Sequence, residues 1–151
     1  MTNKHLTFAI FGNSFQPRKS QSLMRVLDFL RSKGASIIFD RTFYDFLTAE
    51  QNQELGEVGT FEGDDFNADY VISMGGDGTF LKAAVRVGIK SIPLIGINMG
   101  RLGFLADVLP GEVETALQAV LEGNYNIEEH TAIQISTNGG DFDGCHYALN
   151  D

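Results

Sequence analysis

Residues 75–79, Gly-Gly-Asp-Gly-Thr, place an acidic side chain inside a glycine-rich turn. Glycines lack a Cβ atom, so their backbone N–H groups can come close to the oxygens of a phosphate. A helix that begins near Thr79 would add a partial positive charge at the same place. Asp77 would repel a phosphate unless it met a metal ion or accepted a proton, and this favours a catalytic role for Asp77. The alternative is a structural turn in which Asp77 caps the helix that follows.

The segments around this motif alternate between short apolar runs and stretches with helical spacing. Buried strands are predicted from four apolar runs, at 6–11, 37–39, 70–74 and 92–97. Helices are predicted from apolar spacing at 20–33, 79–87 and 110–121, and more weakly at 41–56. An acidic stretch from there to Asp65 predicts a loop. This alternation implies an α/β fold with a parallel sheet, helices on both faces, and ligands at the carboxyl ends of the strands.

The pattern changes after residue 123. Residues 125–136 alternate in part, 138–141 form an Asn-Gly-Gly-Asp turn sequence, and 145–149 return as a second run, so a β-hairpin is predicted. An isolated hairpin leaves open edges and is marginally stable in water. We therefore expect residues 1–124 to form the α/β domain that carries the glycine-rich motif. Residues 125–151 are expected to be the opening strands of a second, β-rich domain that is cut off.

Composition and charge disfavour several classes of protein. A net charge of −9 and a pI near 4.6 argue against binding a nucleic-acid backbone. No apolar run approaches the roughly 18 residues of a membrane span, and the first residues lack a signal-peptide pattern, so we expect no membrane partner and a cytoplasmic location. Residues 102–151 hold nine acidic residues and no Lys or Arg. This end favours basic groups supplied from elsewhere, either by missing sequence or by a partner subunit, with a solvated acidic surface as the alternative.

Two motifs, taken together, resemble those of the NAD kinase family. They are GGDGTFL at 75–81 and GINMGRLGFL at 96–105, and they match the family in order, spacing and strand context. The resemblance is recognisable from Ala68 to Asp151. It implies an ATP-dependent enzyme that transfers the γ-phosphate of ATP to the 2′-hydroxyl of the adenosine ribose of NAD, giving NADP. The α/β part would be its kinase domain.

The resemblance also implies roles for individual residues. Asp77 would be the general base that takes the proton from the 2′-hydroxyl, and Asp77 and Gly78 would contact the dinucleotide. Lys82 stands where the family often has a basic residue on the ligand, with a solvated helix lysine as the alternative. Asn150 and Asp151 align with the family's Asn-Glu pair, whose side chains hold the NAD. Asp151 is one methylene shorter than the commoner glutamate, and turn chemistry is the alternative for this pair.

Partners and cofactors follow from the same resemblance. NAD and ATP would be the substrates, Mg²⁺ or a similar divalent ion would arrive with ATP, and the protein would form a homo-oligomer, a dimer or a tetramer. The glycines at 96, 100 and 103 predict a tight loop at a strand end, which lines the site in the family.

One alternative is a related kinase with a GGDG-like loop that acts on a lipid or a sugar, which the second motif disfavours. Another is a nucleotide-binding or assembly module without turnover.

Overall fold

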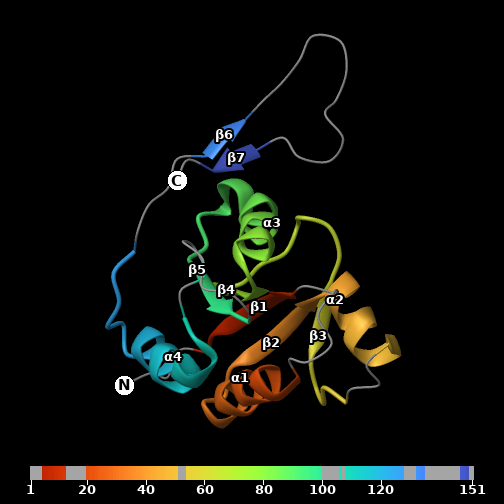
Figure 1. Cartoon of the computed structure of the whole chain (residues 1–151), viewed down its shortest axis with the longest axis vertical. Coiled ribbons are helices and arrows are strands. Elements are labelled where there is room, and N and C mark those ends of the chain that lie inside the picture. Colours follow the sequence, from red (N-terminus) through yellow and green to blue (C-terminus); the bar gives the residue numbers. More distant parts are fainter. Residues whose placement is uncertain are drawn as a thin grey trace.

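Five parallel strands form the central sheet of the protein, in the order β3-β2-β1-β4-β5 (Figure 1). The computed structural model describes residues 5–12, 20–50, 54–99, 106, 108–127, 132–134 and 147–149. The strands of the sheet are β1 (Thr7–Gly12), β2 (Ser36–Asp40), β3 (Gly59–Phe61), β4 (Tyr70–Gly75) and β5 (Leu94–Asn98). The predicted α/β fold with a parallel sheet is confirmed.

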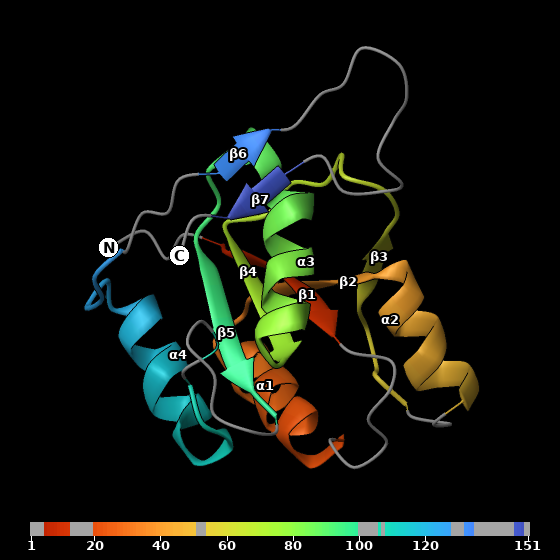
Figure 2. The ribbon, with the colours of Figure 1, turned by 45° about the horizontal axis from the view of Figure 1, so that its top comes forward.

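Helices cover both faces of this sheet, as the sequence predicts. One face packs against α1 (Ser20–Ser32) and α4 (Val113–Leu121), and the latter follows the short helical turn η3 (Pro110–Glu112). The opposite face packs against α3 (Asp77–Val87), which continues into the turn η2 (Gly88–Lys90) (Figure 2). Helix α2 (Arg41–Asp45) continues as the wider turn η1 (Phe46–Glu50) and packs on the same cluster as α1.

Alternate side chains of the central strand β1 pack on the two opposite faces of the sheet. Phe8 and Ile10 join the apolar cluster beneath α1 and α4, whereas Ala9 and Phe11 join the cluster beneath α3. Successive side chains of a strand point to opposite faces, so a strand covered on both sides is apolar at every position. The uninterrupted apolar run in the sequence is therefore the signature of this central position.

The loop predicted up to Asp65 is wrong over β3. This strand pairs in parallel with the end of β2 and forms one edge of the sheet. Its residues Gly59, Thr60 and Phe61 are exposed or half-buried and carry no periodic pattern that would indicate a strand. Packing explains the strand, since the ring of Phe61 lies 4.6 Å from that of Phe66 and 5.4 Å from that of Phe11, centroid to centroid.

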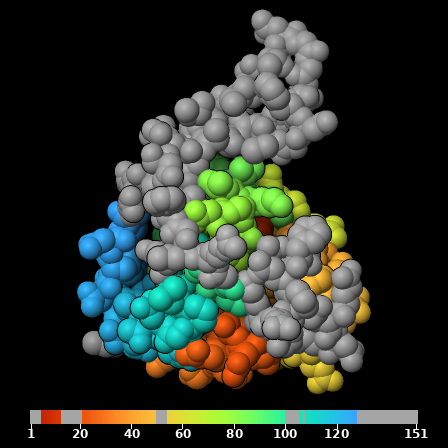
Figure 3. All heavy atoms as spheres, viewed as in Figure 1, coloured from red at the N-terminus to blue at the C-terminus, as the bar shows by residue number. Residues whose placement is uncertain are grey.

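An ion pair joins α1 to α4, which lie side by side on one face of the molecule (Figure 3). Arg25 donates from Nε to Oε1 of Glu114 at 2.7 Å, from Nη2 to Oε2, and from Nη1 to the carbonyl of Pro110 at 2.8 Å. The hydrogen bonds from Arg25 lower the pKa of Glu114, and the same bonds raise the pKa of Arg25. Because both side chains are well exposed, the ion pair adds little to the free energy of unfolding. Its main effect is to fix how α1 and α4 lie against each other.

Near the end of the chain, β6 (Ala132–Gln134) and β7 (Tyr147–Leu149) pair antiparallel, which agrees with the predicted hairpin strands. The predicted turn at 138–141 lies outside the described residues. Strand β7 packs against α3 (Figure 1). None of the helices in the described part of the chain combines the length and the hydropathy needed to cross a membrane.

Tyr125, just after α4, is joined to Tyr70, the first residue of β4. The two hydroxyl oxygens lie 2.9 Å apart, and the rings meet edge to face with centroids 6.2 Å apart. Tyr70 also stacks on Phe8 at 5.3 Å. The hydrogen bond with Tyr125, aided by burial, raises the pKa of Tyr70 to about 12.

Tyr70 should therefore ionise near pH 12 rather than near pH 10. Because the folded state favours the neutral form, the stabilisation from this group is complete below pH 10 and is lost as the pH rises towards 12. An alkaline titration followed by tyrosinate absorbance measures this. In Tyr125→Phe the late ionisation should move back towards the usual tyrosine range, whereas Tyr44→Phe should leave it in place. A late ionisation that survives Tyr125→Phe would show that another group causes the shift.

Candidate functional site

The GGDG motif lies where β4 ends and α3 begins. Strand β4 ends at Gly75, Gly76 holds the helix cap position, and α3 begins at Asp77. Strand β1 pairs with β2 on one side and with β4 on the other, so the strand order reverses direction between β1 and β4. Open α/β sheets bind ligands at the carboxyl ends of the strands beside such a reversal. The motif therefore occupies the place where this fold binds a ligand.

Asp77 is the first residue of α3 and is half-buried. The positive end of the helix dipole favours a carboxylate in this turn. Its Oδ1 accepts a hydrogen bond from the backbone N–H of Ala106 at 3.2 Å. The alternative in which Asp77 caps the helix is wrong, because Gly76 holds the cap position. Asp77 instead binds the far end of the second motif's loop.

The chain that leaves β5 returns alongside it. Val108 forms a parallel bridge with Ile97, accepts a hydrogen bond from the N–H of Asn98 at 2.7 Å, and donates one to the carbonyl of Gly96 at 3.1 Å. The buried side chain of Asn98 donates from Nδ2 to the carbonyl of Ala106 at 3.1 Å. The chain is thus fastened to β5 at Ala106 and Val108.

Gly96 makes room for this return. A Cβ atom on Gly96 would lie 2.7 Å from Cα of Ala106 and 2.8 Å from Cδ2 of Phe80, closer than such atoms can approach. The prediction that Gly96 marks a tight loop is wrong, because Gly96 lies inside β5 and its missing side chain admits Ala106. Gly100 and Gly103 lie outside the described residues.

Sequence reasoning missed Asn98 and Ala106 as parts of this site. The available signal for Asn98 was a polar residue at the carboxyl end of an otherwise apolar strand, where parallel sheets bind their ligands. No signal marked Ala106, because its role depends on its backbone N–H and carbonyl groups rather than on its side chain.

The other predicted site residues fall into three groups. Gly78 is exposed in the first turn of α3, beside Asp77, and a Cβ atom there would meet nothing within 4 Å. Lys82 is exposed on α3 about 140° around the helix axis from Asp77, so the structure does not bring these two side chains together. Asn150 and Asp151 lie outside the described residues. Across the residues that are described, no group of three or more His, Cys, Asp or Glu side chains could hold a metal ion.

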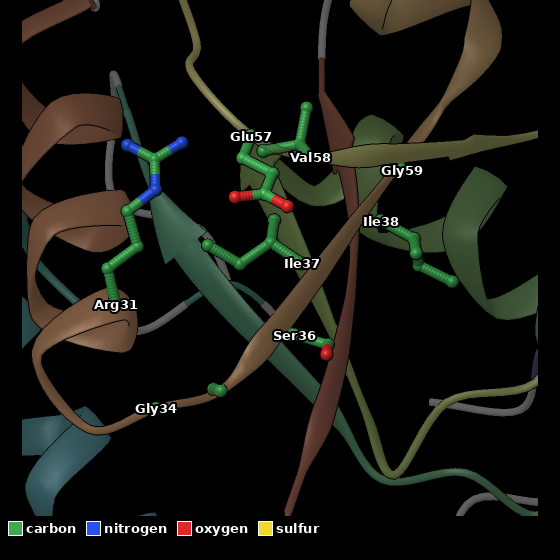
Figure 4. Close-up of a pocket in the computed structure, with 9 residues that line it drawn as sticks. Arg31, Gly34, Ser36, Ile37, Ile38, Glu57, Val58 and Gly59 are labelled. Atoms are coloured by element: carbon green, nitrogen blue, oxygen red, sulfur yellow. The ribbon is translucent and has the colours of Figure 1, made fainter.

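A hollow of about 590 Å³ lies at the opposite edge of the sheet (Figure 4). Arg31 of α1, residues 34–38 at the start of β2, and residues 57–59 line it. The guanidinium of Arg31 donates to the carbonyl of Leu55. The hollow lies where the parallel strands β2 and β3 begin, whereas Asp77 lies where β4 ends, so it is separate from the candidate site.

Comparison with known proteins assigns the fold to a family. A family model described as the ATP-NAD kinase N-terminal domain matches residues 8–125. The chain belongs to the NAD kinase family. The NAD kinase of Bacteroides fragilis is 44% identical over 146 residues, which cover 97% of this chain and 50% of that protein. The NAD kinase of Porphyromonas gingivalis is 34% identical over 143 residues, covering 95% and 49%. The chain spans about half the length of these NAD kinases.

The fold agrees with that of a solved structure, yeast NADH kinase complexed with NADH. The TM-score is 0.73 with 16% sequence identity, over 95% of this chain and 46% of that chain. At this identity the likeness shows a shared fold. The NAD kinase resemblance predicted from residues 75–81 and 96–105 is confirmed, and both motifs lie inside the matched region.

Proposed function

We propose that the protein is an ATP-dependent NAD kinase, which transfers the γ-phosphate of ATP to the 2′-hydroxyl of the adenosine ribose of NAD. The observation that carries this proposal is the position of Asp77 at the carboxyl edge of β4, hydrogen-bonded to Ala106 at the far end of the second motif's loop. Membership of the NAD kinase family supports the choice of substrates. The products are NADP and ADP.

Asp77 acts in this proposal as the general base. Its carboxylate takes the proton of the 2′-hydroxyl while that oxygen attacks the γ-phosphorus of ATP. The new oxygen–phosphorus bond forms as the bond between the γ-phosphorus and the bridging oxygen breaks, and ADP leaves with that electron pair. The N–H of Ala106 orients the carboxylate by donating to Oδ1.

The start of α3 is the proposed cradle for phosphate groups. Cβ atoms built on Gly76 and Gly78 meet nothing within 4 Å, so the backbone there is open to a ligand. The helix N-terminus adds partial positive charge. The chain carries a net charge of −9, so the ATP phosphates need further neutralisation, and we assign this to Mg²⁺ or a similar divalent ion that arrives with ATP.

We also propose that Lys82, Asn150 and Asp151 contact the ligand, with Lys82 meeting phosphate charge and the other two hydrogen-bonding NAD. Membership of the NAD kinase family supports this assignment.

Residues 125–151 would open a second, β-rich domain after the 1–124 kinase domain, and the antiparallel pairing of β6 and β7 supports that division. We propose a homo-oligomer, a dimer or a tetramer, that works in the cytoplasm, where NAD and ATP are available.

Formation of NADP tests the proposed function. The protein that the complete gene encodes is incubated with NAD, ATP and Mg²⁺, and NADP is measured with an NADP-specific dehydrogenase. We expect NADP to form with ATP and none to form from an NAD analogue that lacks the adenosine 2′-hydroxyl. Absence of NADP, or phosphate transfer to a lipid or a sugar instead, would overturn the proposal.

Gly78→Ala should separate ligand contact from folding. Alanine is favoured over glycine in a helix by roughly 0.5–1 kcal/mol, so the variant should be at least as stable as the wild type. If NAD approaches the backbone at Gly78, the added methyl group raises the KM for NAD about tenfold, a cost near 1.4 kcal/mol. Thermal unfolding and steady-state kinetics measure the two effects. Gly111→Ala, with equally open surroundings, is the matched control, and an unchanged KM in Gly78→Ala would argue against the contact.

A further inference from the structure

Asn98 is the last residue of β5 and is fully buried, with 0% of its surface exposed. A buried amide is costly unless its polar groups are paired. The Asn98 side chain donates from Nδ2 to the carbonyl of Ala106 at 3.1 Å, and its backbone N–H donates to the carbonyl of Val108 at 2.7 Å. One residue thus holds two points of the returning chain.

Ala106 connects Asn98 to Asp77. Its carbonyl accepts the hydrogen bond from Asn98, and its N–H donates to Oδ1 of Asp77 at 3.2 Å. Ala106 is itself fully buried and rests on Gly96, where no side chain intervenes. With its carbonyl held by Asn98 and its backbone seated on the sheet, Ala106 is held in place with its N–H directed at Oδ1 of Asp77. The carboxylate that receives this N–H is oriented by the same contacts.

We propose that Asn98 is a positioning residue for Asp77, acting through the backbone of Ala106 to orient the catalytic carboxylate. This inference rests on the proposed function, in which Asp77 is the base. Asn98 stabilises the geometry of the base and takes no part in holding the substrate. Loss of its amide should therefore lower kcat and leave the KM for NAD nearly unchanged, because a displacement of a catalytic group by about 1 Å can cost roughly 100-fold in rate.

A double-mutant cycle in the complete protein tests the inference. In the wild-type background, Asn98→Ala should lower kcat roughly 10- to 100-fold. In the Asp77→Asn background, the same substitution should change the residual rate by less than about threefold, since residues that act as a unit are not additive. A residue that merely stabilises the fold would lower the rate by the same factor in both backgrounds. Equal factors, or an effect confined to the KM, would overturn the inference.

Hydrogen exchange of the Ala106 amide is a second readout that does not depend on activity. The amide should be protected in the wild type and exchange faster in Asn98→Ala. Asn98→Ser, which leaves a smaller cavity, should give the same result if Asn98→Ala does not fold. Unchanged protection in the folded variant would overturn the inference and leave the proposed function standing. A wild type that makes no NADP would overturn the proposed function, and with it the role of Asp77 as the base.

Ser73→Ala is the control for removing a buried polar group. Ser73 lies in the neighbouring strand β4, is fully buried, and its hydroxyl has no hydrogen-bond partner in the described part of the chain. This substitution should leave kcat within roughly twofold of the wild type and should not alter the exchange of the Ala106 amide. A loss of rate as large as that of Asn98→Ala would mean that buried polarity in general, and not the link to Asp77, supports activity.

Discussion

Asp77→Asn should lower kcat for NADP formation by about 100- to 10,000-fold, the usual contribution of a positioned general base. The amide keeps the size of the carboxylate. Its oxygen can still accept the hydrogen bond from the backbone N–H of Ala106, whose nitrogen lies 3.2 Å from Oδ1 of Asp77. It cannot take the proton of the 2′-hydroxyl. The dissociation constant for NAD should therefore stay close to that of the wild type, and steady-state kinetics with calorimetric binding measures both quantities.

Asp45→Asn is the matched control for Asp77→Asn. Asp45 lies on α2, is well exposed and pairs only with Arg41 among the contacts described, so the same change of charge occurs away from the site. This control should keep its kcat. If Asp77→Asn also keeps near-normal activity, Asp77 is a structural residue of the helix start and the base lies elsewhere.

Gly96→Ala should damage stability and activity together. The new Cβ atom would lie 2.7 Å from Cα of Ala106 and 2.8 Å from Cδ2 of Phe80, so the Ala106 backbone must move. Forcing a methyl group into a packed region costs about 1–3 kcal/mol in the free energy of unfolding. Movement of Ala106 also displaces the N–H that orients Asp77, and we expect kcat to fall by about 100-fold.

Denaturant unfolding and steady-state kinetics measure these two losses. Gly111→Ala introduces the same methyl group where nothing lies within 4 Å and should be nearly neutral in both assays. A Gly96→Ala protein with wild-type stability and wild-type kcat would show that Ala106 does not rest on β5 as the structure describes.

The sequence predicts those helices and strands whose pattern of apolar residues follows from which of their faces are buried. Apolar runs marked β1 and β4 because both strands are covered on two faces, and the glycine-rich turn after β4 marked the start of α3. Strand β3 was not predicted, because its three residues lie at a sheet edge and carry no periodic pattern of apolar residues. Its position depends on the packing of Phe61 with distant rings.

In the candidate site the sequence alone points to Asp77 and Gly78, whose roles stay predictions. Asp77 and Gly78 stood out because a carboxylate among glycines at a strand end has few structural uses. The link from Asn98 through Ala106 to Asp77 could not be predicted, because it joins residues that are 8 and 29 positions apart through backbone groups. Such bonds leave no trace in residue types, so only the folded chain reveals them.

The central claim is that Asp77 removes the proton of the 2′-hydroxyl during phosphoryl transfer. Single-turnover transfer from γ-labelled ATP to NAD tests this claim most directly, because it excludes product release and, once the labelled ATP is fully bound, substrate binding. It is measured for the wild type and Asp77→Asn with the enzyme in excess over the labelled ATP and with NAD saturating. We expect labelled NADP from the wild type and a rate about 100- to 10,000-fold lower from the variant. Equal single-turnover rates would contradict the role of Asp77 as the base.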